Sequence, residues 1–164
     1  TTTGFTITEL DNMGILLPVL IMLLAFVGAC SGSVGGGIKA WRINILIRLA
    51  FDNITKIMHP TAVSTIKFNG EKIEQKQIES VFSFVAIYVL IAILFLLALM
   101  LQNIDFYSAF SAVSATLNNL GPGLGQFSDN YSSLEPAGKI TLSLAMIIGR
   151  LEIFGFLLLY SDKL

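Results

Sequence analysis

Basic residues are missing from two long parts of this sequence, residues 1–38 and residues 103–138. Both parts carry only a few acidic charges, whereas seven of the ten Lys and Arg residues lie between Lys39 and Lys76. The 164 residues are 54% hydrophobic and only 13% charged, which is typical of a membrane protein and excludes an ordinary soluble domain. By the positive-inside rule, we expect residues 39–80 to be cytoplasmic and the two parts without basic residues to face outside.

The sequence has a single cysteine, and it contains no motif that is typical of an enzyme. The single Cys30 excludes an internal disulfide and cannot form a thiolate metal site by itself. The glycines that end at Gly37 fail the phosphate-binding pattern, because Ile38 separates them from Lys39. We therefore expect neither an enzyme nor an organic cofactor nor a nucleic acid partner. The start of the chain also lacks an initiator Met and a basic leader, so we expect a piece of a longer protein.

Long apolar runs are present, and they predict an all-α integral membrane fold. Residues 81–101 form an unbroken apolar run that can cross a bilayer as one helix. The charge-free stretch at 12–38 is long enough too, but five glycines among residues 28–37 make a continuous helix costly, at about 1 kcal/mol each. The other expected elements are helices at 13–27, 38–58 and 137–160, and a small hairpin within 62–73.

A short apolar segment, residues 106–117, cannot cross a membrane. Twelve helical residues rise only about 18 Å, against a hydrocarbon core of about 30 Å. Asp105 can cap the start of this helix, and the glycine-rich residues 118–125 follow its end. Non-helical backbone at membrane depth survives only inside protein or along a water-filled path, an arrangement that is typical of ion pores.

The chemistry of this segment favours a monovalent cation. The last carbonyls of the short helix and the negative end of its dipole are expected to point toward the membrane centre. The glycine loops contain no carboxylate, which suits a divalent ion poorly, and carbonyl oxygens can replace the hydration shell of K⁺. The alternative is a loop that only fills space. A weak internal repeat supports the pore: a glycine loop, an acidic linker and an apolar helix follow Gly4 and again Gly121, and Gly32 and Gly149 lie equally far downstream.

Arg150 lies in the middle of the last apolar run. An arginine at a helix centre costs about 2.5–3.5 kcal/mol on insertion scales, so it is expected to face a cavity or a partner. We expect Arg150 to face an inner cavity and to act as an electrostatic barrier to cations. The alternative is a structural ion pair, for which Glu152 is available.

Four motifs in order resemble one known family over essentially the whole chain. They are TTGF from Thr2, GACSGSVGGGIK from Gly28, ATLNNLGPGLG from Ala115 and GRLEIF from Gly149. They resemble the Trk/Ktr/HKT superfamily of potassium-translocating membrane subunits, and within it the bacterial TrkH family. The resemblance implies four helix–pore-loop–helix repeats around one pore, of which one and a half are present here.

The resemblance also implies roles for particular residues. The selectivity filter would contain Thr2, Thr3, Gly4, Phe5, Asn119, Leu120, Gly121 and Pro122, with K⁺ held through Thr3, Gly4, Leu120 and Gly121. The gate would contain Gly28, Gly32, Gly35, Gly36, Gly37, Lys39 and the cavity-facing Arg150. Expected partners are membrane lipid, a second copy of the full-length subunit and a cytoplasmic nucleotide-binding regulatory subunit.

The resulting prediction is a subunit for passive K⁺ uptake in the bacterial inner membrane, with residues 39–80 and the C-terminus in the cytoplasm. Residues 1–58 would hold the end of the third filter and a broken inner helix with the gating loop. Residues 59–80 would form a cytoplasmic hairpin and linker, and residues 81–164 the fourth repeat. One alternative is an ion-coupled secondary transporter with broken helices. Another is a membrane assembly subunit that does not conduct.

Overall fold

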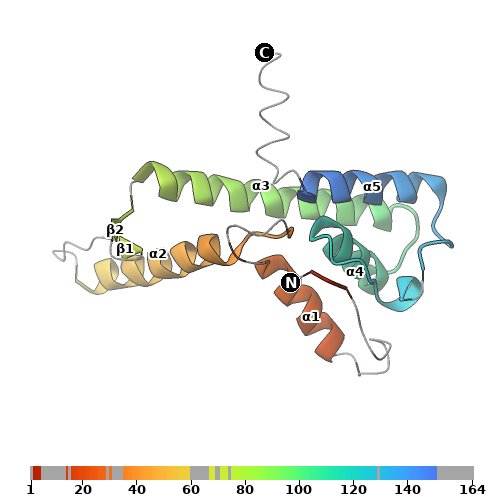
Figure 1. The fold of residues 1–164 in the computed structure, drawn as a ribbon, viewed down its shortest axis with the longest axis horizontal. Coiled ribbons are helices and arrows are strands. Elements are labelled where there is room, and N and C mark those ends of the chain that lie inside the picture. Colours follow the sequence, from red (N-terminus) through yellow and green to blue (C-terminus); the bar gives the residue numbers. More distant parts are fainter. Residues whose placement is uncertain are drawn as a thin grey trace, which may run out of the picture.

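The computed structural model describes residues 2–4, 14, 16–28, 30, 35–59, 67–68, 71–73, 75–128 and 130–150. These residues are almost entirely helical (Figure 1). The elements in chain order are α1 (Leu16–Val27), α2 (Ala40–Met58), β1 (Lys67–Phe68), β2 (Glu71–Lys72), α3 (Gln75–Met100), α4 (Phe106–Leu117), the 3₁₀ helix η2 (Gly125–Phe127) and α5 (Pro136–Arg150).

The first apolar stretch is broken where the glycines predicted a break. Helix α1 ends at Val27, and Gly28 follows with a φ of +70°, a value that L-residues with side chains rarely adopt. The helical path resumes only at Ala40. The Ile38 N–H donates to the Phe26 carbonyl across the break at 2.9 Å, so the two ends of the loop are joined. Phe26 before the break and Ile38 after it therefore lie next to each other.

The predicted hairpin is present as a short antiparallel pair. Lys67 lies opposite Lys72 and Phe68 lies opposite Glu71, which leaves two residues for the turn. The rest of the predicted first strand, residues 62–66, lies outside the described residues. In Figure 1 the hairpin sits at the end of the molecule where α2 finishes and α3 begins.

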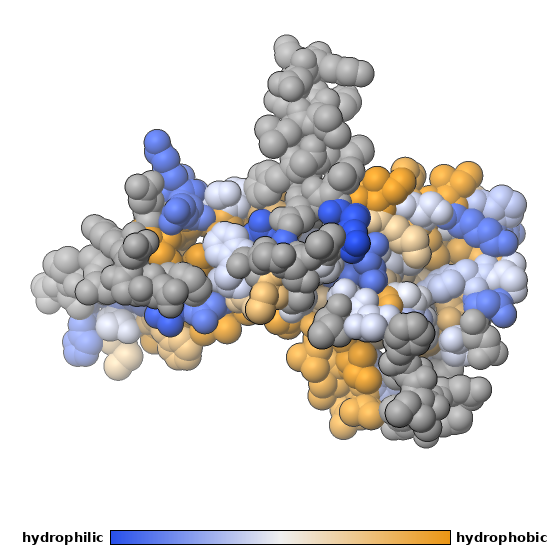
Figure 2. Space-filling model, in the orientation of Figure 1, coloured by the Kyte–Doolittle hydropathy of each residue, from blue (hydrophilic) through white to orange (hydrophobic). Residues whose placement is uncertain are grey.

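Helix α3 is, among the described residues, the helix that is long and apolar enough to cross a membrane. Its 26 residues rise about 39 Å, which exceeds the roughly 30 Å of a hydrocarbon core. Its outward side chains are strongly exposed, for example Phe82 at 62%, Leu90 at 59% and Leu94 at 57%. Figure 2 shows apolar surface over α1 and over the part where α3 and α5 lie, while hydrophilic residues gather near the hairpin. Such apolar surface requires lipid or further protein to cover it.

Helix α4 is buried in the core of the described structure. It packs against α1, α3 and α5, and residues 108, 109 and 111–117 are buried. Leu99 of α3, Val113 of α4 and Leu142 of α5 belong to one apolar cluster. A helix that is buried on nearly every side cannot be a surface helix, so α4 sits inside the protein as the pore interpretation requires.

Candidate functional site

The start of α4 is capped as predicted. The Ser108 N–H donates to Oδ2 of Asp105 at 3.0 Å, and Asp105 itself has an extended backbone, as an N-cap residue does. This backbone hydrogen bond to the carboxylate lowers the pKa of Asp105. The charge therefore stays on the carboxylate and complements the positive end of the helix dipole.

The other end of α4 closes in a Schellman motif. The Leu120 N–H donates to the Ala115 carbonyl at 2.7 Å, and the Asn119 N–H donates to the Thr116 carbonyl at 3.1 Å. Asn119 adopts the left-handed conformation that this cap needs, with a φ of +55°. The Ser114 carbonyl accepts from the Asn118 N–H at 3.2 Å. Three of the last four helix carbonyls thus accept hydrogen bonds from the chain that follows the helix.

Two serines that sequence reasoning missed hold that loop to α4. The Leu124 N–H donates to Oγ of Ser111 at 3.0 Å, and the Gln126 N–H donates to Oγ of Ser108 at 3.1 Å. Both serines are buried, and each accepts a hydrogen bond from a backbone N–H of the segment that follows α4. The signal in the sequence was a series of hydroxyl residues, at 108, 111, 114 and 116, on a short and mostly apolar helix.

The two predicted filter segments meet in the structure. Gly4 packs against the Leu120 carbonyl oxygen and Pro122 so closely that a Cβ on Gly4 would clash. The two segments also share a backbone pattern: φ is +53° at Thr2 and +76° at Gly4, and it is +55° at Asn119 and +105° at Gly121. Thr2 and Asn119 are 117 positions apart in the sequence, and so are Gly4 and Gly121. Thr3 lies beside them with an exposed side chain, and Phe5 lies outside the described residues.

The predicted gating loop contacts the end of α4. A Cβ on Gly36 would lie 2.7 Å from the Asn118 carbonyl oxygen and 2.9 Å from the Asn118 Cα, so only glycine allows this approach. Gly28 and Gly37 lie against each other at the base of the loop. Lys39 is buried, with a φ of +71°, directly before α2. Gly35 is half-buried, and Gly32 lies outside the described residues.

Asn118 is the residue on which these elements converge. Its side chain is fully buried; Nδ2 donates to the Ser114 carbonyl at 2.8 Å, and Oδ1 accepts from the hydroxyl of Tyr88 on α3. Both polar atoms of the amide are therefore satisfied inside the protein. Sequence reasoning assigned no role to Tyr88, because a tyrosine in an apolar run gives no hint of its partner.

Helix α5 reaches the same point from the other side. Gly149 packs directly onto the Leu117 carbonyl oxygen, and a Cβ there would collide with it. The side chain of Asn119 donates to the Met146 carbonyl at 3.5 Å. Arg150 is exposed at the last described position of α5. Glu152, the predicted partner in the alternative ion pair, lies outside the described residues.

A cavity of about 200 Å³ lies between the filter segments and the helix break. Its lining includes Thr2 and Leu120 from the two filter segments and Gly28 from the break, together with Ala25 of α1. The cavity thus joins the two regions to which the sequence assigned selection and gating. Among the described residues, no group of three His, Cys, Asp or Glu could hold a metal ion.

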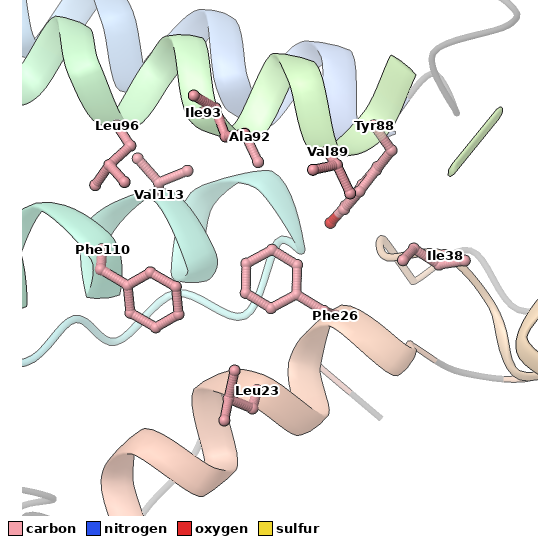
Figure 3. Close-up of a pocket in the computed structure, with 10 residues that line it drawn as sticks. All are labelled: Leu23, Phe26, Ile38, Tyr88, Val89, Ala92, Ile93, Leu96, Phe110 and Val113. Atoms are coloured by element: carbon pink, nitrogen blue, oxygen red, sulfur yellow. The ribbon is translucent and has the colours of Figure 1, made fainter. Parts of the chain in front are cut away.

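A larger groove of about 330 Å³ lies between α1, α3 and α4 (Figure 3). Phe26 of α1 and Phe110 of α4 face each other across it, with Ala92 and Leu96 of α3 along its side. The lining is almost wholly apolar, so this groove suits hydrocarbon and cannot coordinate an ion.

A membrane-length apolar helix, a buried half-length helix and two contacting glycine loops define a helical membrane transport fold. The chain belongs to the TrkH family, described as a cation transport protein, whose pattern matches residues 1–164. This membership confirms the resemblance noted in the sequence and the expectation that the chain is not an enzyme.

Individual relatives agree with this assignment. The chain is 41% identical over 161 residues to the Trk system potassium uptake protein TrkH of Escherichia coli K12, covering 98% of this chain and 33% of that protein. It is 35% identical over 143 residues to TrkG of the same organism, covering 87% and 30%. The crystal structure of the potassium transporter TrkH from Vibrio parahaemolyticus matches with a TM-score of 0.88 and 42% identity, over 97% of this chain and 34% of that chain. The chain therefore spans about a third of the length of these relatives.

Proposed function

We propose that this chain is part of a potassium uptake subunit that conducts K⁺ passively through a filter of backbone carbonyls. The observation that carries the proposal is the contact between Gly4 and Leu120, made by two segments with the same alternating backbone pattern. Relatives that match nearly the whole chain are named potassium uptake proteins, which supports K⁺ as the ion.

The backbone pattern has a direct consequence for ion binding. In each segment a positive φ occurs at every second residue, at Thr2 and Gly4 and at Asn119 and Gly121. Such alternation can turn the carbonyl groups of consecutive residues toward one side, as in a filter that is built from rings of backbone carbonyls. Carbonyl oxygens that converge in this way can replace the water around a dehydrated K⁺. The filter would be completed by repeats that this chain does not include.

The gate would lie directly below this filter. The cavity that touches Thr2 and Leu120 also touches Gly28, the first residue after the end of α1. Gly36 of the same loop rests on Asn118, at the end of the pore helix. A change in the loop would therefore occur beside the ion path, and Arg150 would add an electrostatic barrier below it.

The expected orientation and partners belong to the same proposal. The segment from α2 to the start of α3 carries most of the basic residues and would lie in the bacterial cytoplasm, where it offers a surface to a nucleotide-binding regulatory subunit. The relatives are named as parts of a Trk system, which supports a multi-subunit assembly. A further partner would be a second copy of the full-length subunit.

An ion-coupled secondary transporter is the second candidate, because broken helices such as α1–α2 also occur in that class. Coupling would need an intramembrane ionisable group, and Glu152 is the carboxylate in the last apolar run. Loss of proton-coupled flux in Glu152→Gln would favour this candidate over passive conduction.

The decisive experiment is ⁸⁶Rb⁺ and ²²Na⁺ uptake by the full-length protein carrying Gly121→Ser. We expect the Rb⁺/Na⁺ ratio to fall about tenfold, because a side chain strains the backbone at a φ of +105° by about 1–2 kcal/mol. Gly14→Ser is the matched control, since Gly14 also has a positive φ and open space around it but lies before α1. An unchanged ratio in Gly121→Ser would refute the filter.

A further inference from the structure

Tyr131, in the segment between η2 and α5, contacts the loop that follows α4. Its hydroxyl donates to the Gly121 carbonyl at 3.3 Å. Its ring stacks on Phe127 with a centroid distance of 5.1 Å and an interplanar angle of 12°. The hydroxyl also lies 2.9 Å from the place that a Cβ on Gly123 would occupy. The tyrosine is thus fixed by its ring and presents its hydroxyl to the loop.

Gly121 needs such support, because nothing packs against it on the side where a side chain would point. Among the described residues, no atom lies within 4 Å of the position of a Cβ on Gly121, so packing on that side does not restrain this residue. Hydrogen bonds do so instead: the Gly121 N–H donates to the Ala115 carbonyl at 3.3 Å, and the Gly121 carbonyl accepts from Tyr131. A carbonyl oxygen has two lone pairs, so the tyrosine occupies one and leaves the other for an ion.

The hydroxyl keeps its proton throughout the physiological pH range. Burial raises the pKa of Tyr131 to about 12, because the charged phenolate would lose its contact with water. Tyr131 is therefore a constant hydrogen-bond donor and not a pH-sensitive group.

We propose that Tyr131 is a positioning residue for ion selection, which holds the Gly121 carbonyl at the distance that suits K⁺. A carbonyl that is held by this hydrogen bond resists moving inward to surround the smaller Na⁺, whereas a carbonyl without the bond moves more freely. The inference rests on the proposed filter and adds to it a side chain outside both glycine loops. Sequence analysis assigned no function to Tyr131.

The test compares two hydroxyl deletions in the same segment of the full-length protein. Tyr131→Phe removes the donor to Gly121 and keeps the ring on Phe127. Ser132→Ala removes the neighbouring hydroxyl, which donates to the Asn130 side chain and not to the filter. Uptake of ⁸⁶Rb⁺ and ²²Na⁺ is measured per copy of membrane-inserted protein, so that differences in expression do not affect the ratio.

We expect Tyr131→Phe to lower the Rb⁺/Na⁺ uptake ratio about 2- to 10-fold, the range that corresponds to the net contribution of one hydrogen bond. Ser132→Ala should leave the ratio unchanged. Phe127→Leu keeps the hydroxyl but removes the ring that orients it, and it should lower the ratio in the same direction. If Tyr131→Phe fails to accumulate in the membrane, the Rb⁺/Na⁺ ratio of Phe127→Leu tests the proposal instead.

Other outcomes overturn the inference in distinguishable ways. If the unmutated protein prefers Rb⁺ and Tyr131→Phe retains that preference, the filter stands and the role of Tyr131 is refuted. If Ser132→Ala lowers the ratio as much as Tyr131→Phe does, the effect belongs to the fold of the segment and the role of the hydroxyl is again refuted. If the unmutated protein takes up both ions equally, the proposed filter itself fails, and the inference fails with it.

Discussion

Gly121 and Gly36, one from each of the two glycine-rich loops (residues 118–125 and residues 28–37), need glycine for opposite reasons. Among the described residues, no atom lies within 4 Å of a Cβ on Gly121, but its φ is +105°, so its backbone conformation is what demands glycine. Gly36 has no positive φ, but a Cβ there would lie 2.7 Å from the Asn118 carbonyl oxygen. Gly121 needs an unusual conformation, and Gly36 needs a close approach.

The means of restraint differ in the same way. Ser111 of α4 holds residues 118–125 through a directional hydrogen bond from the Leu124 N–H, and Ser108 holds the adjacent Gln126 N–H in the same way. Residues 28–37 are joined at their base by the Ile38–Phe26 backbone bond, and Gly36 rests on Asn118 by contact. A directional bond preserves a geometry, whereas a contact between backbones can separate and re-form at little cost. The difference agrees with the proposed roles, selection for residues 118–125 and movement for residues 28–37.

The largest effect is expected at Gly149, where a Cβ would meet the Leu117 carbonyl oxygen most closely. Gly149→Ala places a Cβ onto the Leu117 carbonyl oxygen and must push α5 away from the end of α4. We expect Rb⁺ uptake to fall more than tenfold and the free energy of unfolding to decrease by about 1–3 kcal/mol. Thermal unfolding of the purified full-length protein measures the second quantity. Ser143→Ala on the exposed face of α5 should change neither, and an unaltered melting temperature in Gly149→Ala would contradict the close packing.

A smaller and different effect is expected at Gly36. Gly36→Ala should lift the loop from Asn118 and raise Rb⁺ influx several-fold, because the gate is displaced while the filter is untouched. The Rb⁺/Na⁺ ratio should therefore stay constant while the absolute influx rises. A changed ratio with unchanged influx would reverse the roles proposed for the two loops.

Ser111→Ala should have the opposite effect to Gly36→Ala: it should change the Rb⁺/Na⁺ ratio and should not raise the total influx. The Leu124 N–H would lose its acceptor inside the protein, at a cost of about 1–3 kcal/mol for a buried unsatisfied group. We expect a lower Rb⁺/Na⁺ ratio and reduced stability, without a rise in total influx. Thr141→Ala is the matched control, since its hydroxyl bonds only within α5 and is exposed. Equal effects in the two variants would mean that the loop does not depend on the serine.

The smallest effect is expected from the cap of α4. The pKa of Asp105 is lowered in the folded protein from its ordinary value of 3.8, chiefly by the Ser108 N–H, so its stabilisation is present above that value and is lost as the pH falls through the folded pKa. Unfolding midpoints measured from pH 7 to pH 3 should show this loss. Asp105→Asn retains a cap and should flatten the acid-induced decrease; an identical decrease in the variant would assign it to other carboxylates.

Local chemistry made much of the fold predictable. The unbroken apolar run at residues 81–101 predicted the membrane-length helix α3. Asp105 predicted the start of α4, and the asparagines and glycines after Leu117 predicted its end. Each signal depends only on residues near it in the chain. The small break after Val27 was predictable for the same reason, since glycine is costly in a helix.

The contacts between distant residues were not predictable in this way. Nothing local to Ser111 reveals that it accepts from Leu124, and nothing near Tyr88 points to Asn118, thirty positions away. The bonding of the last α4 carbonyls was also missed, because a Schellman cap depends on the φ of Asn119. The roles of the filter and gate residues remain predictions for the experiments above.

The shortness of α4 has a consequence for how the protein is made. Twelve residues with a polar bond at each end are too short to enter a bilayer as an independent span, so α4 depends on the elements that flank it, of which α3 has membrane length. The segment between them then has to be drawn inward as its serines find their backbone partners. Assembly of the ion path would accordingly be a late event in biogenesis, and lesions there would leave insertion intact while preventing maturation.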